Sequence, residues 1–229
     1  MAAETFPSEA SINRTLITDL YPHIKPEVPG CEESLILLKI RSKLLHFFVE
    51  TKAWVYEMDP FKVKEGETDY DLEWPQDVSN IETIKTLTLN EVEQSPGIDY
   101  TISCCRTMVS LVVEPSADTA ATEEGVKVTL ILKPRSNIQQ INTCMYEEWY
   151  QTWAWGVMSD LMKMPNKKWT DKAASVEYNK YYVDGTSEAR NENIRERLNV
   201  PLMARSPFQF AQGSQRNSYY YGSQFRRVL

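Results

Sequence analysis

The chain has 229 residues, 42% of them hydrophobic, and a formal net charge of −7. This length and apolar content can bury the core of one large domain or of a body with an inserted module. The acidic balance argues against a protein that binds nucleic acid with its whole surface, because such proteins are normally basic. The start MAAETFPSEASINRT lacks the basic and apolar stretches of a secretory signal, and no apolar run is long enough to span a bilayer. We therefore expect no contact with a membrane.

The first segment, residues 1–30, contains four prolines, Pro7, Pro22, Pro26 and Pro29, which forbid a continuous helix. The stretch INRTLITDLYPHI has enough apolar residues for one short helix or one strand that packs on the body. We interpret the rest of residues 1–30 as an extended N-terminal entry.

Residues 32–55 contain no glycine or proline and open with two glutamates, which the dipole of a helix favours in its first turn. Leu37, Ile40, Leu44 and Phe47 recur at helical spacing, and further apolar residues widen the stripe. A stripe this wide predicts a helix that is buried on more than one side. This helix, within residues 31–57, is expected to be the spine of a helical body.

Residues 58–140 change to short β-branched runs separated by glycine and proline. The runs are FKVKEGETDYDLEWP, NIETIKTLTL, DYTISCC, MVSLVVEP and VKVTLILKP. They predict four to six antiparallel strands in a small sandwich or open barrel, with SADTAATEEG as an exposed loop. Residues 56–100 hold twelve acidic residues and three lysines. This acidic surface is either an ordinary solvated face or one that repels another polyanion.

Residues 141–198 return to helical periodicity and complete the body. The first stripe consists of Trp149, Trp153, Val157, Leu161 and Met164. The second consists of Ala174, Tyr178, Tyr181, Gly185 and Ala189, and its small members suit close approach to another backbone. The charged stretch RNENIRERLN that follows is expected to be solvated or to face a neighbour.

The stretch MKMPNKKWTD joins these two helices and predicts a tight structural corner. Pro165 is expected to end the first helix, Thr170 to be the N-cap of the second, and Trp169 to fold back over the apolar stripe between them. So short a connection forces antiparallel packing. A DNA-binding helix-turn-helix is disfavoured because the second helix is acidic and aromatic.

The C-terminal arm, residues 199–229, contains four arginines and no Asp, Glu or Lys, so it carries +4 and the rest of the chain −11. It is too polar to fold alone, yet it is rich in aromatic residues. We interpret it as an arm that becomes ordered on a partner, with Phe208-Gln209-Phe210 suited to an added strand; a disordered terminus is the alternative. The expected contact residues are Arg205, Phe208, Phe210, Arg216, Tyr219, Tyr220, Tyr221, Phe225, Arg226 and Arg227.

Residues with catalytic or metal-binding chemistry are scarce. The two histidines, His23 and His46, have no Cys or carboxylate at metal-ligand spacing, and the chain has no phosphate-binding or nucleophile motif. Asp69 and Asp71 alternate on a predicted strand without the glycine and closing glutamate of a calcium loop. The four cysteines form no CxxC pair and are expected to be reduced thiols. We expect no metal, no cofactor and no enzymatic activity.

Three stretches, in order, resemble the adaptor or head-to-tail connector proteins of short-tailed and related long-tailed bacteriophages. HIKPEVPGCEESLILLKIRSKLLHFFVETKAWVYEMDPFKVKEGETDYDL is similar to the family's proline-rich entry, first helix and following strands. PGIDYTIS is similar to a strand start in the family's central module. YEEWYQTWAWGVMSDLMKMPNKKWTDKAASVEYNKYYVDGTSEAR is similar to the closing helical hairpin, with its Met-Pro-x-Lys-x-Trp-like corner. The sequence after Arg190 matches no motif of the family.

The resemblance implies a ring, usually of twelve copies, that lies beneath the portal protein and joins it to the tail tube or nozzle. DNA would pass through its channel without sequence-specific binding. The implied location is the neck of the virion, after synthesis in the host bacterial cytoplasm. The helices would form the ring wall and the β module would project from it. The C-terminal arm would contact portal or a neighbouring subunit.

The expected fold class is therefore α+β, with a helical bundle, an inserted antiparallel β-sandwich or barrel-like module, and extended terminal arms. The bundle would consist of the spine helix and the C-terminal hairpin. Two alternatives to the adaptor stay open. One is another tail-assembly protein, such as a tail terminator or nozzle subunit. The other is a monomeric β module that binds a ligand.

Overall fold

The computed structural model describes residues 13–113, 115 and 125–198, with the side chains of residues 195–198 excepted. It divides into a compact unit that ends at Asn193 and a second unit that begins at Ile194, and the following description concerns the first unit.

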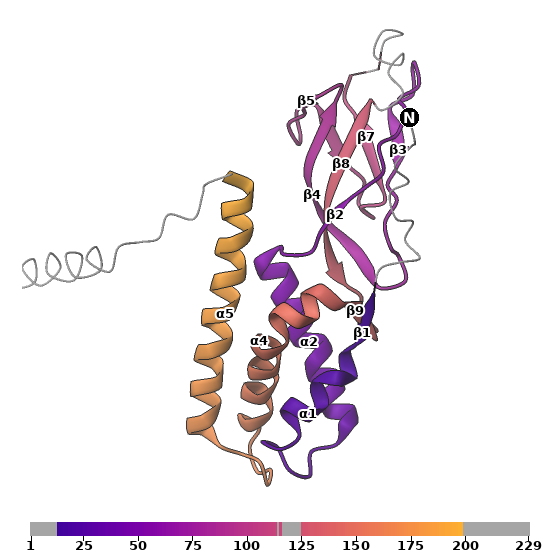
Figure 1. The fold of residues 1–229 in the computed structure, drawn as a ribbon. Coiled ribbons are helices and arrows are strands. Elements are labelled where there is room, and N and C mark those ends of the chain that lie inside the picture. Colours follow the sequence, from indigo (N-terminus) through magenta and orange to yellow (C-terminus); the bar gives the residue numbers. More distant parts are fainter. Residues whose placement is uncertain (1–12, 114, 116–124, 199–229) are drawn as a thin grey trace, which may run out of the picture. The chain divides into compact units, whose positions relative to one another are not determined.

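The fold is mixed α+β (Figure 1). The N-terminal elements are β1 (Arg14–Leu16), the 3-10 helix η2 (Ile17–Leu20), α1 (Tyr21–Ile24) and α2 (Glu33–Thr51). The strands that follow are β2 (Val55–Glu57), β3 (Asp69–Asp71), β4 (Ser79–Leu89), β5 (Val92–Glu93), β6 (Tyr100–Ile102), β7 (Met108–Leu111), β8 (Val126–Pro134) and β9 (Gln140–Asn142). The long C-terminal helices are α4 (Thr143–Met162) and α5 (Lys172–Leu198).

The stretch INRTLITDLYPHI, predicted to form one short helix or one strand that packs on the body, forms β1, η2 and α1, whereas residues 25–30 form turns in place of the expected extended entry. β1 pairs antiparallel with β9, with Thr15 opposite Ile141. Ile17, Leu20 and Ile24 then recur at helical spacing and are buried. Pro22 lies in the first turn of α1, where a proline removes no helical hydrogen bond. Residues 1–12 lie outside the described part.

The predicted spine helix is present as α2 but ends earlier than expected. Ile40, Leu44 and Phe47 of the predicted stripe are buried, whereas the predicted Leu37 is half-buried and its neighbour Ile36 is buried instead. Lys52 ends the helix in the left-handed conformation, with φ of 55°. The Asn193 side-chain amide donates to the carbonyls of Thr51, at 3.2 Å, and Lys52. These carbonyls are among those that a helix end leaves without an intrahelical partner.

The strands form three antiparallel sheets and no closed barrel among the described residues. The four-stranded sheet has the order β2-β8-β4-β5, the three-stranded sheet β3-β7-β6, and β1 pairs with β9 alone. β4 and β8 form the main ladder, from Ser79 opposite Pro134 to Leu89 opposite Val126, with two register shifts in β4. Since strand residues alternate between faces, Val126, Val128, Leu130 and Leu132 of β8 all enter the core. The strand expected at DYTISCC stops at Ile102, and Cys104 and Cys105 lie in a turn.

α4 carries the predicted aromatic stripe and packs on α2. Trp149, Trp153, Val157 and Leu161 are buried as expected, and Met164 is half-buried beyond the end of the helix. The rings of Phe47 and Trp153 are 5.7 Å apart in an edge-on contact. The contact therefore joins the helix that precedes the strands to the helix that follows them.

α5 runs alongside α4 (Figure 1), and its packed face differs from the prediction by one residue. Tyr182 is 3% exposed, whereas the predicted Tyr181 is 39% exposed. A Cβ atom on Gly185 would lie 2.5 Å from Thr152 Oγ1, and one on Gly156 would lie 2.6 Å from Tyr182 Cδ2. A glycine in each helix therefore makes room for a side chain of the other helix, and not for its backbone as predicted.

No helix in the described ranges is long and apolar enough to cross a lipid bilayer.

Gly185→Ala should lower the free energy of unfolding by about 1–3 kcal/mol, because the added methyl group collides with Thr152. Alanine is the better helix former, so helix propensity alone would raise stability by about 1 kcal/mol. Urea unfolding measures the net effect. Asn191→Ala, at an exposed position of the same helix, is the matched control and should change little. A stabilised Gly185→Ala protein would contradict the close packing.

Candidate assembly surfaces

The corner between α4 and α5 begins before Pro165. α4 ends at Met162, three residues before the proline that the sequence predicts to end it. A proline disfavours helical geometry in the residue before it, which is Met164, and the chain turns with Asn166 at φ of 58°. The Asp171 amide then donates to the Met162 carbonyl at 3.1 Å. This bond closes the loop and sets the two helices antiparallel.

The N-cap of α5 is Asp171 and not Thr170. The Asp171 carboxylate accepts hydrogen bonds from the amides of Ala173 and Ala174, at 2.9 and 3.0 Å. Thr170 stabilises the loop between the two helices instead. Its hydroxyl donates a hydrogen bond to the Met164 carbonyl at 2.6 Å and accepts one from the Lys167 amide at 3.0 Å. Threonine and aspartate both make N-caps, so the sequence could not decide between the adjacent residues.

Trp169 lies half-buried and packs against the hydrophobic core. The Lys167 ammonium is 5.9 Å from the centre of the indole ring. The indole Nε1 is shielded from solvent and has no hydrogen-bond partner among the described residues.

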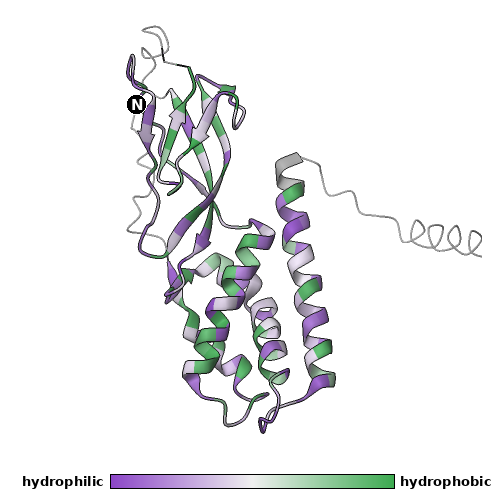
Figure 2. Cartoon of the chain, turned by 180° about the vertical axis from the view of Figure 1, so that it is seen from behind, coloured by the Kyte–Doolittle hydropathy of each residue, from purple (hydrophilic) through white to green (hydrophobic). Residues whose placement is uncertain are grey.

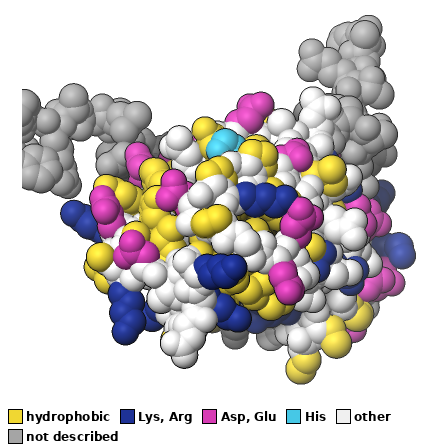
Figure 3. Space-filling view, turned by 90° about the horizontal axis from the view of Figure 1, so that it is seen from below, with side chains coloured by type: hydrophobic (Ala, Val, Ile, Leu, Met, Phe, Trp, Pro, Cys, Tyr) yellow, Lys and Arg dark blue, Asp and Glu magenta, His cyan; other side chains and the backbone are white. Residues whose placement is uncertain are grey.

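Figure 3 shows the molecule from below, relative to the view of Figure 1. Apolar side chains on this face lie between separate basic and acidic groups.

The outward surface of α5 has two flanks of opposite charge. The basic flank consists of exposed residues at helical spacing: Lys172, Val176, Lys180, Val183 and Arg190. The acidic flank consists of exposed residues offset from these around the helix: Glu177, Tyr181, Asp184, Glu188 and Glu192. Sequence reasoning singled out neither flank. The charged residues of each flank do recur three or four positions apart in the sequence. A single helix contains several rows with this spacing, however, and only the packing of α5 shows which rows face outward.

The acidic flank borders α4. The rings of Tyr181 and Trp155 are 5.3 Å apart, and the Tyr181 hydroxyl donates to the Glu177 carboxylate at 2.8 Å. This carboxylate raises the pKa of Tyr181 above its ordinary value. α4 adds the exposed Glu147 and Glu148 to the same charge.

The basic flank borders α2. Arg190 lies 3.7 Å from the Glu50 carboxylate, and the His46 ring nitrogen lies 3.0 Å from the Tyr182 hydroxyl. The Lys43 ammonium lies 4.8 Å from the centre of the Tyr182 ring and pairs with Asp160 at 3.0 Å. Burial raises the pKa of Tyr182 to about 12. The α2–α5 contact is therefore polar at its margin.

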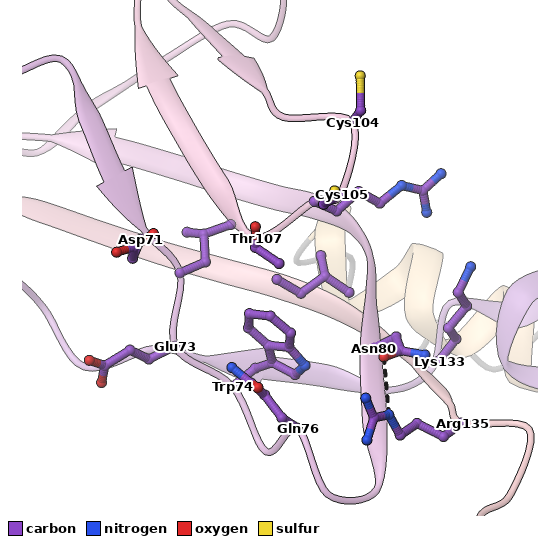
Figure 4. Close-up of a pocket in the computed structure, with 13 residues that line it drawn as sticks. Asp71, Glu73, Trp74, Gln76, Asn80, Cys104, Cys105, Thr107, Lys133 and Arg135 are labelled. Carbon is purple, nitrogen blue, oxygen red and sulfur yellow. Dashed lines mark hydrogen bonds between the residues drawn. The ribbon is translucent and has the colours of Figure 1, made fainter.

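A pocket of about 620 Å³ lies between the two larger sheets (Figure 4). Its lining places carboxylates on one side, at Asp71 and Glu73, and cations on the other, at Lys133 and Arg135. The Arg135 Nε donates to Asn80 Oδ1 at 3.3 Å, and the Trp74 indole donates to the Ser79 carbonyl at 3.2 Å. The pocket thus offers charged groups that could orient a polar ligand.

Glu82 links the cations beside this pocket. Its carboxylate lies 2.6 Å from Lys133 Nζ and 3.1 Å from the Arg106 guanidinium. Burial alone would raise the pKa of Glu82, but Lys133 and Arg106 outweigh burial and lower it below its ordinary value. The sequence offered no reason to pair Glu82 with residues so distant in the chain.

Within the described residues no group of three or more His, Cys, Asp or Glu side chains could hold a metal ion. His23 contacts the ring of Tyr150, at 4.9 Å between ring centres. None of the four cysteines forms a disulfide. The ten predicted contact residues of the C-terminal arm all lie outside the described part, so their role stays a prediction.

No protein-family model matches the chain, and no curated protein matches it significantly.

Trp169→Ala should lower the free energy of unfolding by about 2 kcal/mol, because it removes a half-buried ring from the corner. Thermal or urea unfolding measures the loss. Lys168→Ala changes an exposed neighbour in the same loop and should have almost no effect. Equal stability of the two variants would show that the indole contributes nothing to the fold.

Glu82→Gln should destabilise the protein at neutral pH, and this effect should shrink under acidic conditions. The pKa of Glu82 is lower in the folded state, so its carboxylate stabilises the fold above the unfolded-state pKa of about 4.5. This contribution is lost as the pH falls through the folded-state pKa. Urea unfolding of both proteins from pH 7 to pH 3 tests this, with the exposed Glu65→Gln as control. A difference that stays constant with pH would contradict it.

Proposed function

We propose that the chain is a structural virion protein, a head-to-tail adaptor of a bacteriophage neck. Copies of it would form a ring of twelve subunits beneath the portal protein and join portal to the tail tube or nozzle. The proposal includes no cofactor and no catalytic step. The site of action would be the virion neck, after synthesis in the host bacterial cytoplasm.

The observation that carries the proposal is the helical hairpin of α4 and α5. The stretch with the strongest resemblance to the adaptor family occupies this hairpin, and its Met-Pro-x-Lys-x-Trp-like part forms the tight corner closed by Asp171 and Met162. The resembling stretch at the start of the chain occupies α1, α2, β2 and β3. Each stretch therefore falls on elements of the kind that the resemblance implies.

On this proposal α2, α4 and α5 form a bundle that builds the ring wall, and the strands form an inserted sandwich or barrel-like module that projects from it. The acidic charge of the chain outside the C-terminal arm, −11, fits a channel wall that DNA must slide past. Phosphate groups bind to lysine and arginine, so an acidic wall would not retain them. DNA would then pass without sequence-specific contacts.

The C-terminal arm would bind portal or a neighbouring subunit through its arginines and aromatic side chains. Its charge of +4 is opposite to that of the rest of the chain. Opposite charges speed encounter between partners, and aromatic residues and arginine supply much of the binding energy at protein interfaces.

A monomeric ligand-binding module is the second candidate, and the pocket between the two larger sheets favours it. Its volume of about 620 Å³ is within the range of small-molecule sites. This candidate predicts a monomer at all concentrations and full function without the C-terminal arm.

Another tail-assembly protein, such as a tail terminator or nozzle subunit, is the remaining alternative. The mass of the purified assembly and its binding to isolated portal would distinguish an adaptor from such a protein.

Deletion of residues 208–229 should leave the body folded and weaken its capture by portal or by adjacent subunits by about tenfold or more, through loss of the aromatic contacts. Thermal unfolding checks the fold, and pull-down on purified portal together with negative-stain images of filled heads measures capture. A full-length chain with Phe208, Phe210 and Phe225 changed to Ser retains all four arginines and should also lose capture, which separates the aromatic contacts from the charge. Undiminished assembly of the shortened chain would contradict the proposed role of the arm.

A further inference from the structure

The two flanks of α5 face different directions. At 100° per residue their mean directions lie roughly 130° apart around the helix axis. The basic flank is on the side of α2, where Arg190 meets Glu50, and the acidic flank is on the side of α4, where Tyr181 meets Trp155. One copy of the chain can therefore present one flank to each of two neighbours.

Each flank combines charge with exposed apolar surface. On the basic flank Val176 is 72% exposed and Val183 is 49% exposed, and Lys180 lies between them. On the acidic flank the Tyr181 and Trp155 rings lie among Glu177, Asp184 and Glu188. Figure 2 shows hydrophilic and hydrophobic residues interleaved along α5. Apolar contact with matched charge around it is the usual composition of a protein interface.

Two of the three cations on the basic flank form no stabilising pair in the described part of the chain, whereas Arg190 pairs with Glu50. Lys172 lies in the first turn of α5, where the helix dipole disfavours a cation. Within the described residues neither Lys172 nor Lys180 forms an ion pair. These two lysines are therefore available to pair with acidic groups of a partner.

We propose that the partner is a second copy of this chain, and that the basic flank of one α5 docks on the acidic flank of the next. This contact deepens the proposed adaptor function and rests on its self-assembly. Like flanks repel each other, so a symmetric dimer through either flank is disfavoured. The contact is instead head-to-tail, with the basic flank of each copy on the acidic flank of the next. Such a contact produces a closed ring when the rotations from copy to copy add up to a full turn.

Paired charge reversals test the contact in the full-length protein without portal. Lys172→Glu with Lys180→Glu reverses the basic flank, and Asp184→Lys with Glu188→Lys reverses the acidic flank. The changes place acids nearer the start of α5 and bases nearer its end, which favours the helix. Lys62→Glu with Lys127→Glu, at exposed positions among the strands, is the control that alters net charge as much as the first pair.

Sedimentation velocity over a range of protein concentrations, at low and at high salt, is the measurement. The unmodified chain should self-associate, more weakly at high salt because ions screen the charges. Each reversed flank alone should weaken association about tenfold or more, the control should not, and the protein with both flanks reversed should recover. Thermal unfolding of every variant accompanies this measurement, because Lys180 and Asp184 lie four residues apart in α5 and reversing both also restores an opposite-charge pair within the chain. Recovery with unchanged unfolding temperatures supports the contact between copies.

Two results would overturn the inference. One is an unmodified chain that stays monomeric at every concentration and salt. The other is association that the reversals leave unchanged; if deletion of residues 208–229 then abolishes it, the arm occupies the contact in place of the flanks. A chain that stays monomeric would also favour the ligand-binding module, and binding to portal in the separate pull-down then decides between that module and the adaptor.

Discussion

The contact on which the fold depends is the aromatic cluster of Phe47, Phe48, Trp149 and Trp153. Phe47 lies 5.7 Å from both tryptophan rings, and Phe48 reaches from Trp153, at 5.8 Å, to Trp54, at 5.4 Å. Trp54 in turn accepts a backbone hydrogen bond from Leu132 of β8, at 2.8 Å. One cluster therefore holds α2 on α4 and places the start of the strands beside them.

The second constraint is the close approach of α4 and α5. Gly156 and Gly185 leave room for Tyr182 and Thr152, and any larger side chain at either glycine would push the helices apart or rotate them. The rotation of α5 decides which side chains are packed and which face outward. The charged flanks and their use in assembly are therefore a consequence of packing at two glycines.

Much of the architecture followed from residue patterns. The spacing of Trp149, Trp153, Val157 and Leu161 predicted the buried face of α4, and the alternation in VKVTLILKP predicted β8. The errors have local causes. Tyr181 and Tyr182 are equally apolar, so only the position of α4 decides which one is buried; Thr170 and Asp171 can both cap a helix. The end of α2 could not be found because its cap is Asn193, a residue far along the chain.

The sequence by itself determined the element types, the helical hairpin and the separation of charge between the body and its C-terminal arm, because these depend on the periodicity and composition of neighbouring residues. Only the tertiary structure decided that β1 pairs with β9, that Glu82 joins Lys133 and Arg106, and which flanks of α5 face outward. Those features depend on contacts between residues far apart in the chain. The periodicity of a sequence predicts which face of a helix or strand is apolar. Which other element covers that face depends on how the whole chain packs.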